Sequence, residues 1–172
     1  MGFCCLFLLK MIRCNQAYNW MKEINKTMTT LFTIGFAKKS AEQFFSLLIR
    51  AGVKRIIDIR LHNVSQLAGF TKRDDLSYFL EAIAGIDYLH MPSLAPTQEI
   101  FDAYKKKKGG WAAYEESFSA LLRERKPENL LSEEQIQNAC LLCSEPTPDH
   151  CHRRLVAQYL KDCWSDLRIV HL

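Results

Sequence analysis

Short apolar runs alternate with amphipathic stretches from residue 31 to the end of the chain, and this alternation constrains the fold most. The apolar runs have the length of β-strands, and the stretches between them have helical spacing. The predicted strands are 31–36, 55–60, 86–91, 139–145 and 167–172. The predicted helices are 40–52, 73–85, 97–108, 111–125 and 149–164. Ser40 can cap the start of the first helix, and Gly52 can end it. This order predicts an α/β fold with a mostly parallel sheet and helices on both faces, in a three-layer, Rossmann-like arrangement.

The first 30 residues stand apart from this pattern. Their apolar run, residues 3–9, is shorter than the roughly 20 apolar residues that span a bilayer. The segment also lacks the charged start and the small-residue cleavage site of a signal peptide. We therefore expect residues 1–30 to be an extension outside the fold, with Met28 opening the domain and a peripheral or palmitoylated anchor as the alternative. Residues 31–172 are expected to form a single α/β domain without a membrane span.

The number of cysteines and the net charge limit the expected cellular location and the class of ligand. The chain has seven cysteines, three in the first segment and four between residues 140 and 163. This odd and uneven set does not resemble a disulfide framework, so we expect a reducing, cytoplasmic location. The net charge of +4 allows an anionic ligand but does not indicate a nucleic-acid-binding protein. Lysines 105–108 are expected to form a solvated helix end, with a phosphate-binding patch as the alternative.

Polar side chains gather where the predicted strands end. In an open parallel sheet, ligands bind beyond the carboxyl ends of the strands. The residues at those ends are Gly35, Phe36, Asp58, Arg60, His90, Cys143 and Glu145. Ser65 lies in the long loop that follows the second strand, where binding groups are common. The topology therefore predicts a functional site at this edge.

The stretch CLLCSEPTPDHCHRRLVAQYL, residues 140–160, concentrates the reactive side chains. Because side chains alternate along a strand, Cys143 and Glu145 are expected on one face, with Cys140 and Leu142 on the other. The helix that follows is expected to start at Thr147 as its N-cap, with Pro148 in the first helical position.

That helix start would place Cys151 and His152 about one turn into the helix. At about 100° per residue, His152 lies near the centre of the apolar stripe, and Cys151 and Arg153 flank it. Arg154 points to solvent, so Arg153 is the stronger functional candidate of the two arginines.

Three interpretations of the stretch compete. A zinc site could use Cys143, Glu145, Cys151 and His152, whereas Cys140 would face the wrong way. A reactive thiol could use Cys151 near a helix N-terminus, with arginines nearby and His152 or Glu145 moving a proton. A tyrosine-phosphatase signature is excluded because Ala157 stands where the arginine would be needed. The third interpretation is structural, with buried cysteines and an ion network of Asp58, Arg60, Glu145 and Arg153.

Several of these segments together resemble the domain-of-unknown-function 488 family. They are TIGF at 33–36, DIR at 58–60, LLCSE through CHRRLVA at 141–157, and the final VHL. The resemblance implies a three-layer α/β fold with the motifs gathered at one edge. The matching motif positions are Asp58, Arg60, Ser65, Cys143, Glu145, Cys151, His152 and Arg153. The chain departs from many members at Phe36, where they have histidine, and in LHNVS, where they have proline.

From these patterns we predict a small enzyme that acts on an anionic, phosphate- or nucleotide-like substrate. The predicted catalytic residues are Cys151, Glu145, His152 and Asp58. The predicted substrate-binding residues are Arg60, Arg153, Ser65 and Cys143. No residue is assigned to a metal, and the sequence identifies no cofactor. The alternative is a non-catalytic module that binds a metal or a nucleic acid.

Overall fold

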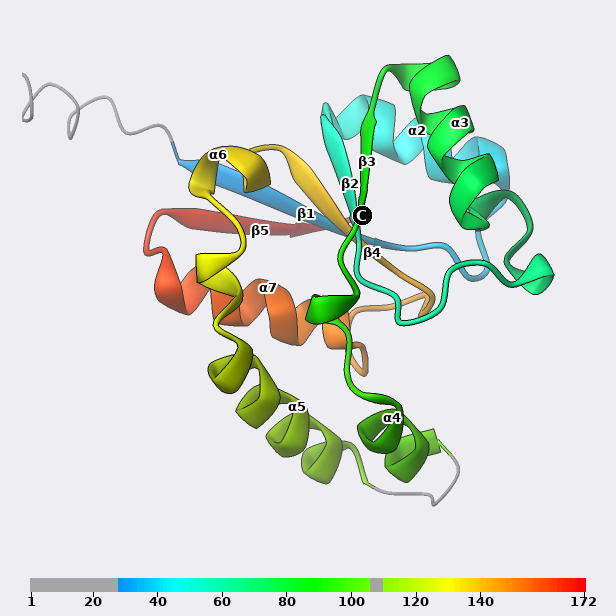
Figure 1. Ribbon diagram of the computed structural model, residues 1–172. Helices are drawn as coiled ribbons and strands as arrows, with labels where there is room; N and C mark the ends of the chain where they lie inside the picture. Colours follow the sequence, from blue (N-terminus) through cyan, green and yellow to red (C-terminus); the bar gives the residue numbers. More distant parts are fainter. Residues whose placement is uncertain (1–27, 106–109) are drawn as a thin grey trace, which may run out of the picture.

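The computed structural model describes residues 28–105 and 110–172 of the chain. The expectations for residues 1–27, and for lysines 106–108, lie outside the described residues. Within them, five strands form a sheet of order β3-β2-β4-β1-β5, and every neighbouring pair is parallel (Figure 1). The strands are β1 (Thr29–Gly35), β2 (Arg55–Asp58), β3 (Asp87–His90), β4 (Ala139–Cys143) and β5 (Leu167–His171). The predicted parallel α/β fold is confirmed.

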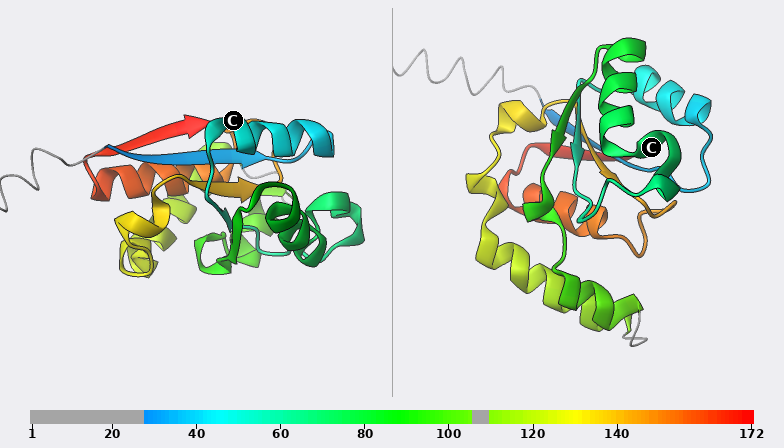
Figure 2. Two further views of the ribbon diagram at one scale, coloured as in Figure 1. Left: turned by 90° about the horizontal axis from the view of Figure 1, so that it is seen from above. Right: turned by 45° about the vertical axis from the view of Figure 1, so that its right-hand side comes forward.

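Helices cover both faces of this sheet. They are α2 (Ala41–Ala51), α3 (Arg73–Ala84), α4 (Gln98–Lys105), α5 (Trp111–Arg125), α6 (Glu133–Ile136) and α7 (His152–Cys163). Figure 2 shows α2 and α3 on one side of the sheet and α7, with α5 beyond it, on the other. None of the helices in the described part of the chain is long and apolar enough to cross a membrane.

The central strand β4 carries the predicted alternation of side chains. All of its residues are buried, because helices lie on both sides of it. Leu141 and Cys143 pack into the core beneath α5 and α7. Cys140 and Leu142 pack into the opposite core, beneath α2 and α3. The strand therefore presents Cys143 and Cys140 to different layers, as expected.

The ends of α2 follow from its sequence. Ser40 and Gln43 form a capping box, in which each side chain accepts from the other residue's main-chain N–H. The helix stops at Gly52, whose φ of 70° lies in the left-handed region that glycine adopts without penalty. Both boundaries were predicted from these residues.

The start of α7 was predicted wrongly. The helix begins at His152 with Cys151 as its N-cap, rather than at Thr147 and Pro148. Residues 144–150 form an irregular loop, because the chain must cross here from the end of β4 to the helix layer. Cys151 therefore stands at the very end of the helix, and not one turn inside it.

Smaller differences concern element boundaries. The first strand begins at Thr29, two residues before the expected start, where its main chain pairs with β5. β4 ends at Cys143, so Glu145 belongs to the loop. The four-residue helix α6 was not predicted, since it is too short to show helical periodicity.

Candidate functional site

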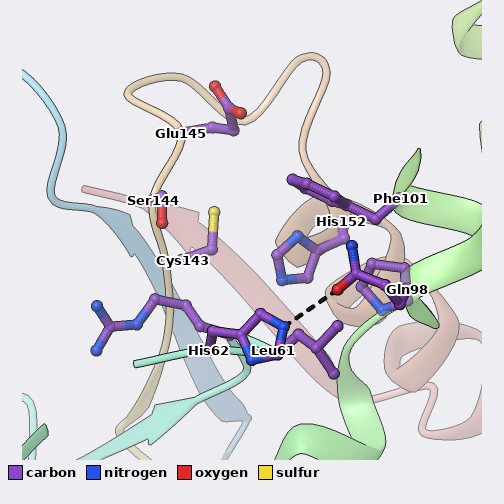
Figure 3. Close-up of a pocket in the computed structure, with 10 residues that line it drawn as sticks. Leu61, His62, Gln98, Phe101, Cys143, Ser144, Glu145 and His152 are labelled. Carbon is purple, nitrogen blue, oxygen red and sulfur yellow. Dashed lines mark hydrogen bonds between the residues drawn. The ribbon is translucent and has the colours of Figure 1, made fainter. Parts of the chain in front are cut away.

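A cavity of about 220 Å³ opens at the carboxyl edge of the sheet, where topology predicted a site (Figure 3). Its lining residues come from the chain after β2, from α4 and the segment leading into it, from the end of β4 and the loop after it, and from the start of α7. They are Arg60, Leu61, His62, Pro96, Gln98, Phe101, Cys143, Ser144, Glu145 and His152. Pockets for drug-sized ligands usually measure about 300–1,000 Å³, so this one suits a small molecule or one end of a larger one.

Strand β4 delivers Cys143 to the floor of this pocket. The side chain is buried, and its sulfur points toward the open space between the labelled residues of Figure 3. The chain after β1 continues to pair with this end of β4. Phe36 donates its main-chain N–H to the carbonyl of Cys143 over 3.2 Å, and Ala37 donates to that of Ser144 over 3.1 Å. The main chain of Cys143 is thus held by hydrogen bonds that continue the pairing of β1 with β4.

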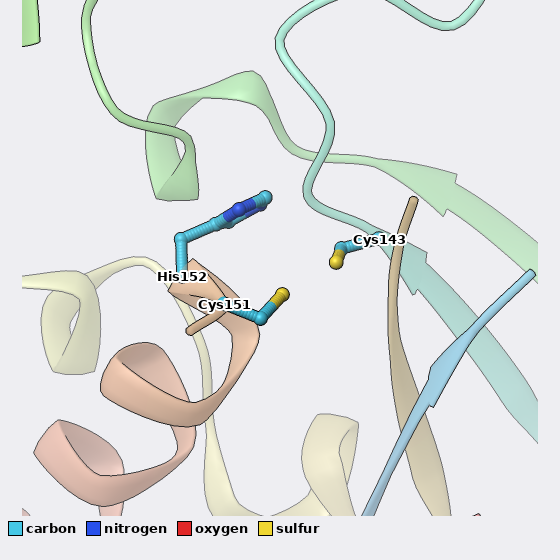
Figure 4. A group of neighbouring side chains, drawn as sticks. All are labelled: Cys143, Cys151 and His152. Carbon is cyan, nitrogen blue, oxygen red and sulfur yellow. The ribbon is translucent and has the colours of Figure 1, made fainter. Parts of the chain in front are cut away.

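The first turn of α7 brings Cys151 and His152 to the same place (Figure 4). The two sulfurs and one ring nitrogen all lie within 4.8 Å of one another. Cys151 is buried but does not line the pocket, whereas Cys143 and His152 do. Cysteine sulfur and imidazole nitrogen are ligand types that zinc accepts, so these three residues could hold a metal ion.

Arg153 connects the two thiols. Its Nη1 donates to Cys143 Sγ and to Cys151 Sγ, each at 3.2 Å, and to the main-chain carbonyl of Glu145 at 2.6 Å. The side chain is fully buried, so its charge is poorly screened by water. The guanidinium group therefore favours negative charge on the sulfur pair, and it has no free face for a substrate.

The two thiols share their protons unequally. Burial by itself raises the pKa of Cys143, but a hydrogen bond with Cys151 and the nearby His152 and Arg153 outweigh it and lower the pKa to about 6. The hydrogen bond with Cys143, together with burial, raises the pKa of Cys151. The shared hydrogen bond and Arg153 therefore favour a state in which the pair holds one proton and the negative charge lies on Cys143.

Two histidines fix the chain that leaves β2. His152 Nε2 donates to the carbonyl of Ile59 over 3.0 Å, and His90 Nε2 donates to the carbonyl of Arg60 over 2.9 Å. A carbonyl oxygen can only accept, so Nε2 of His152 carries the hydrogen. In the neutral ring, Nδ1 of His152 then keeps a lone pair and is available for proton transfer.

Asp58 and Arg60 form a buried ion pair. Arg60 Nε and Nη2 donate to the two Asp58 oxygens at 2.7 and 2.6 Å, and Tyr88 donates its hydroxyl to the same carboxylate at 2.6 Å. Burial alone would raise the pKa of Asp58, but these contacts and the charge of Arg60 lower it. Because Arg60 also donates to Thr71, most of its donors are already used.

Glu145 and Ser65 lie away from the sulfur pair. The carboxylate of Glu145 binds Lys105 Nζ over 2.8 Å, with both side chains well exposed. Only its main-chain carbonyl reaches Arg153, so the suggested ion network splits into separate contacts. Ser65 is exposed and does not line the pocket.

Among the pocket residues that the sequence did not single out are His62, Gln98 and Phe101. His62 and Gln98 face each other across the cavity mouth, with Nε2 and Oε1 3.1 Å apart. His62 could have been found, because it follows the Asp58–Arg60 strand end. Gln98 and Phe101 could not, since they lie on α4, whose position depends on tertiary packing.

The fold and the cluster define a class of protein: a parallel α/β protein with a paired thiol, a histidine and a buried arginine at the carboxyl edge of its sheet. A family model described as Domain of unknown function DUF488 matches residues 40–160, so the chain belongs to this family. No curated protein and no solved structure matches the chain.

Proposed function

We propose that this protein is a small thiol-dependent enzyme in which the thiolate of Cys143 attacks an electrophilic centre of a small anionic substrate. One observation carries the proposal. Cys143 lines the pocket, while Arg153 and Cys151 bind its sulfur from the protein side. A buried thiolate with an adjacent cation and an open face toward a cavity is the usual arrangement of a reactive cysteine.

The geometry favours an exchange of the roles predicted for the two cysteines. Cys143 was expected to bind substrate and Cys151 to react. Cys143 is the better nucleophile, since it faces the cavity and its pKa is lowered to about 6. Cys151 instead donates to it, keeping the negative charge on the sulfur that lines the pocket.

His152 is the best-placed proton carrier. It lines the pocket, and its Nδ1 is free because Nε2 is bound to Ile59. Nδ1 can therefore accept a proton, from solvent or from the incoming substrate, and then pass it to the group that leaves when Cys143 attacks. Asp58 acts as a positioning residue, since it reaches the pocket only through Arg60.

The anionic, phosphate- or nucleotide-like nature of the substrate rests on weaker support. Arg153 is buried behind the sulfurs, and Arg60 is neutralised by Asp58, so neither offers a free guanidinium. Positive potential at the pocket comes from the amino end of the 12-residue helix α7. Lys105 is paired with Glu145, so it would add to this potential only where an anion displaces that carboxylate. These groups would attract an anion without enclosing it.

We also propose a single folded domain in a reducing, cytoplasmic compartment. The helix layers on both faces pack against one sheet, which supports a single domain. The cysteines at 140, 143, 151 and 163 are free thiols, which supports a reducing compartment. A nucleophilic thiol beside a second thiol stays available only where reductants maintain it.

Site-resolved alkylation tests the proposal. The reduced protein is treated with iodoacetamide at pH 7, and each cysteine is followed by peptide mass spectrometry. Cys143 should react at least about tenfold faster than exposed Cys163, since its thiolate is already formed. Inorganic phosphate or AMP should slow the alkylation of Cys143 and leave the alkylation of Cys163 unchanged. The variant Lys105→Gln should weaken this protection of Cys143. If Cys143 reacts no faster than a model thiol, the enzyme proposal fails. If Cys143 reacts fast but neither phosphate nor AMP slows its alkylation, only the proposal of an anionic substrate fails.

A metal-binding module is the second candidate, because Cys143, Cys151 and His152 offer three ligand atoms within 4.8 Å. Arg153 competes with it, since its guanidinium already occupies both sulfurs. Metal content of protein purified without chelators separates the two. Near-stoichiometric zinc that is lost in a Cys143→Ser, Cys151→Ser variant would favour the metal site over the thiolate.

A further inference from the structure

We propose that Cys143 and Cys151 form a reversible disulfide after a hydroperoxide oxidises Cys143, so that the pocket is an oxidation site as well as a reaction site. This goes beyond the proposed function, because the oxidation needs only a hydroperoxide and not the anionic substrate. It shares only the nucleophilic character of Cys143.

Position selects Cys151 as the resolving thiol. The two sulfurs lie within 4.8 Å and share one donor, Arg153 Nη1. Cys140 belongs to the core on the other face of the sheet. Cys163 ends the 12-residue helix α7, roughly 18 Å from its start at 1.5 Å per residue. Among the described cysteines, only Cys151 can reach Cys143.

The backbone around the pair allows the bond to close. A disulfide needs the sulfurs about 2.05 Å apart, so each must move by an ångström or so. Cys151 is the N-cap, with extended φ and ψ of −136° and 137°, and only its carbonyl joins the helix, by accepting from the main-chain N–H of Arg154 over 3.1 Å. The joining segment, residues 144–150, is irregular and largely exposed. The approach can therefore be absorbed by this loop while β4 and α7 stay in place.

The chemistry proceeds in two balanced steps. The Cys143 thiolate attacks one oxygen of the hydroperoxide: an S–O bond forms, the O–O bond breaks, and the alkoxide or hydroxide that leaves takes up a proton. Cys143 is thereby oxidised by two electrons to a sulfenic acid. Cys151 then attacks that sulfur: the S–S bond forms, the S–O bond breaks, and water leaves with the Cys151 proton. An external thiol restores both thiols by exchange.

The size of the pocket suits this co-reactant. A cavity of about 220 Å³ that ends at Cys143 admits hydrogen peroxide or a small organic hydroperoxide. Arg153 stays bonded to the Glu145 carbonyl throughout and keeps its charge beside the reacting sulfur. Formation of the disulfide removes the nucleophile from the pocket and protects it from irreversible oxidation.

The test treats the fully reduced protein with one equivalent of hydrogen peroxide, blocks remaining thiols with N-ethylmaleimide and maps the cysteines by mass spectrometry. Cleavage on the amino side of Asp149 separates Cys143 from Cys151, and cleavage after Leu142 separates Cys140 from Cys143. We expect a Cys143–Cys151 linked peptide that disappears on reduction. In Cys151→Ser or Cys151→Ala, the sulfenic acid of Cys143 should instead be trapped by dimedone, and without dimedone a second equivalent of peroxide should convert it to the sulfinic acid. Cys163→Ser should behave as the unaltered protein.

Two results would overturn the inference: oxidation of Cys143 to the sulfinic acid in the unaltered protein without a linked peptide, or a linked peptide that joins Cys143 to another cysteine. Thermal melting of each variant shows that it is folded. Alkylation without peroxide distinguishes this failure from failure of the proposed function. Fast alkylation of Cys143 without disulfide formation contradicts only the oxidation, whereas slow alkylation contradicts the nucleophile itself.

Discussion

Gly35 lies against the main chain of Glu145 so closely that a Cβ atom at position 35 would stand 1.7 Å from the Glu145 carbonyl oxygen. The same oxygen accepts a hydrogen bond from Arg153 over 2.6 Å. One close approach between the end of β1 and the loop after β4 therefore places the guanidinium group that binds both sulfurs. The glycine is required for space, since its φ is not in the left-handed region.

Replacing Gly35 with alanine should damage both stability and the site. The added methyl group meets main-chain atoms, which cannot rotate away, so the loop and Arg153 must shift. We expect a loss of about 1–3 kcal/mol or more in the free energy of unfolding, measured with urea, and slower alkylation of Cys143. Gly110→Ala is the control, because its Cβ would meet nothing within 4 Å. Equal stability of the two variants would contradict the close approach.

Arg153→Lys should raise the pKa of Cys143. Lysine keeps the positive charge but cannot donate to both sulfurs and the Glu145 carbonyl in the planar geometry of arginine. The pH at which alkylation of Cys143 is half-maximal should rise by about one unit. Arg154→Lys changes the neighbouring arginine, which binds Glu115 and neither sulfur, and should leave that midpoint unchanged. An unchanged midpoint in Arg153→Lys would show that only the positive charge at this position matters, and not the hydrogen bonds that its planar group donates.

The Asp58–Arg60 pair should contribute strongly to folding stability. Asp58→Asn leaves a buried guanidinium without its counter-charge, which typically costs about 3–5 kcal/mol. Asp87→Asn breaks the Arg55–Asp87 pair between β2 and β3, where Arg55 is partly exposed and Asp87 is exposed, and should cost less than about 1 kcal/mol. Urea unfolding of both variants makes the comparison. A similar small cost for both would mean that burial of the first pair is not maintained in solution.

The free energy of unfolding should depend on pH through the ionisation of Asp58 in its pair with Arg60. Because the pKa of Asp58 is lowered in the folded protein, its contribution is fully present above the unfolded value near pH 4 and is lost as pH falls through the folded value. The difference in unfolding free energy between the unaltered protein and Asp58→Asn should therefore shrink below about pH 4. A difference that stays constant down to pH 2 would contradict the lowered pKa.

The sequence predicted the sheet and its edge well, since these depend on local patterns. Continuous apolar runs identified the buried strands, and Ser40 and Gly52 marked both ends of α2. The loop between β4 and α7 was predicted poorly. Thr147 and Pro148 have suitable types for a helix start, but the path from the sheet to the helix layer overrides that local preference.

Residue types alone also could not assign roles within the site. The sequence identified Cys143, Cys151, His152 and Arg153 as candidates, and the structure brings all four together. Which cysteine faces the cavity depends on where the helix begins, so the two roles could not be distinguished. The role of Arg60 could not be assigned from the sequence either, because its charge is neutralised by the ion pair with Asp58, two positions earlier.

The pH profile of Cys143 alkylation is the measurement that tests the central claim most directly. Iodoacetamide reacts with the thiolate, so the rate should rise as pH increases through the pKa and then stay constant. The account predicts a half-maximal rate near pH 6 for Cys143 and a midpoint above the ordinary cysteine value for Cys163, whose pKa is raised by burial and by Glu128. A midpoint for Cys143 at or above about 8.5, the value of a free cysteine, would contradict a thiolate held by Arg153 and Cys151.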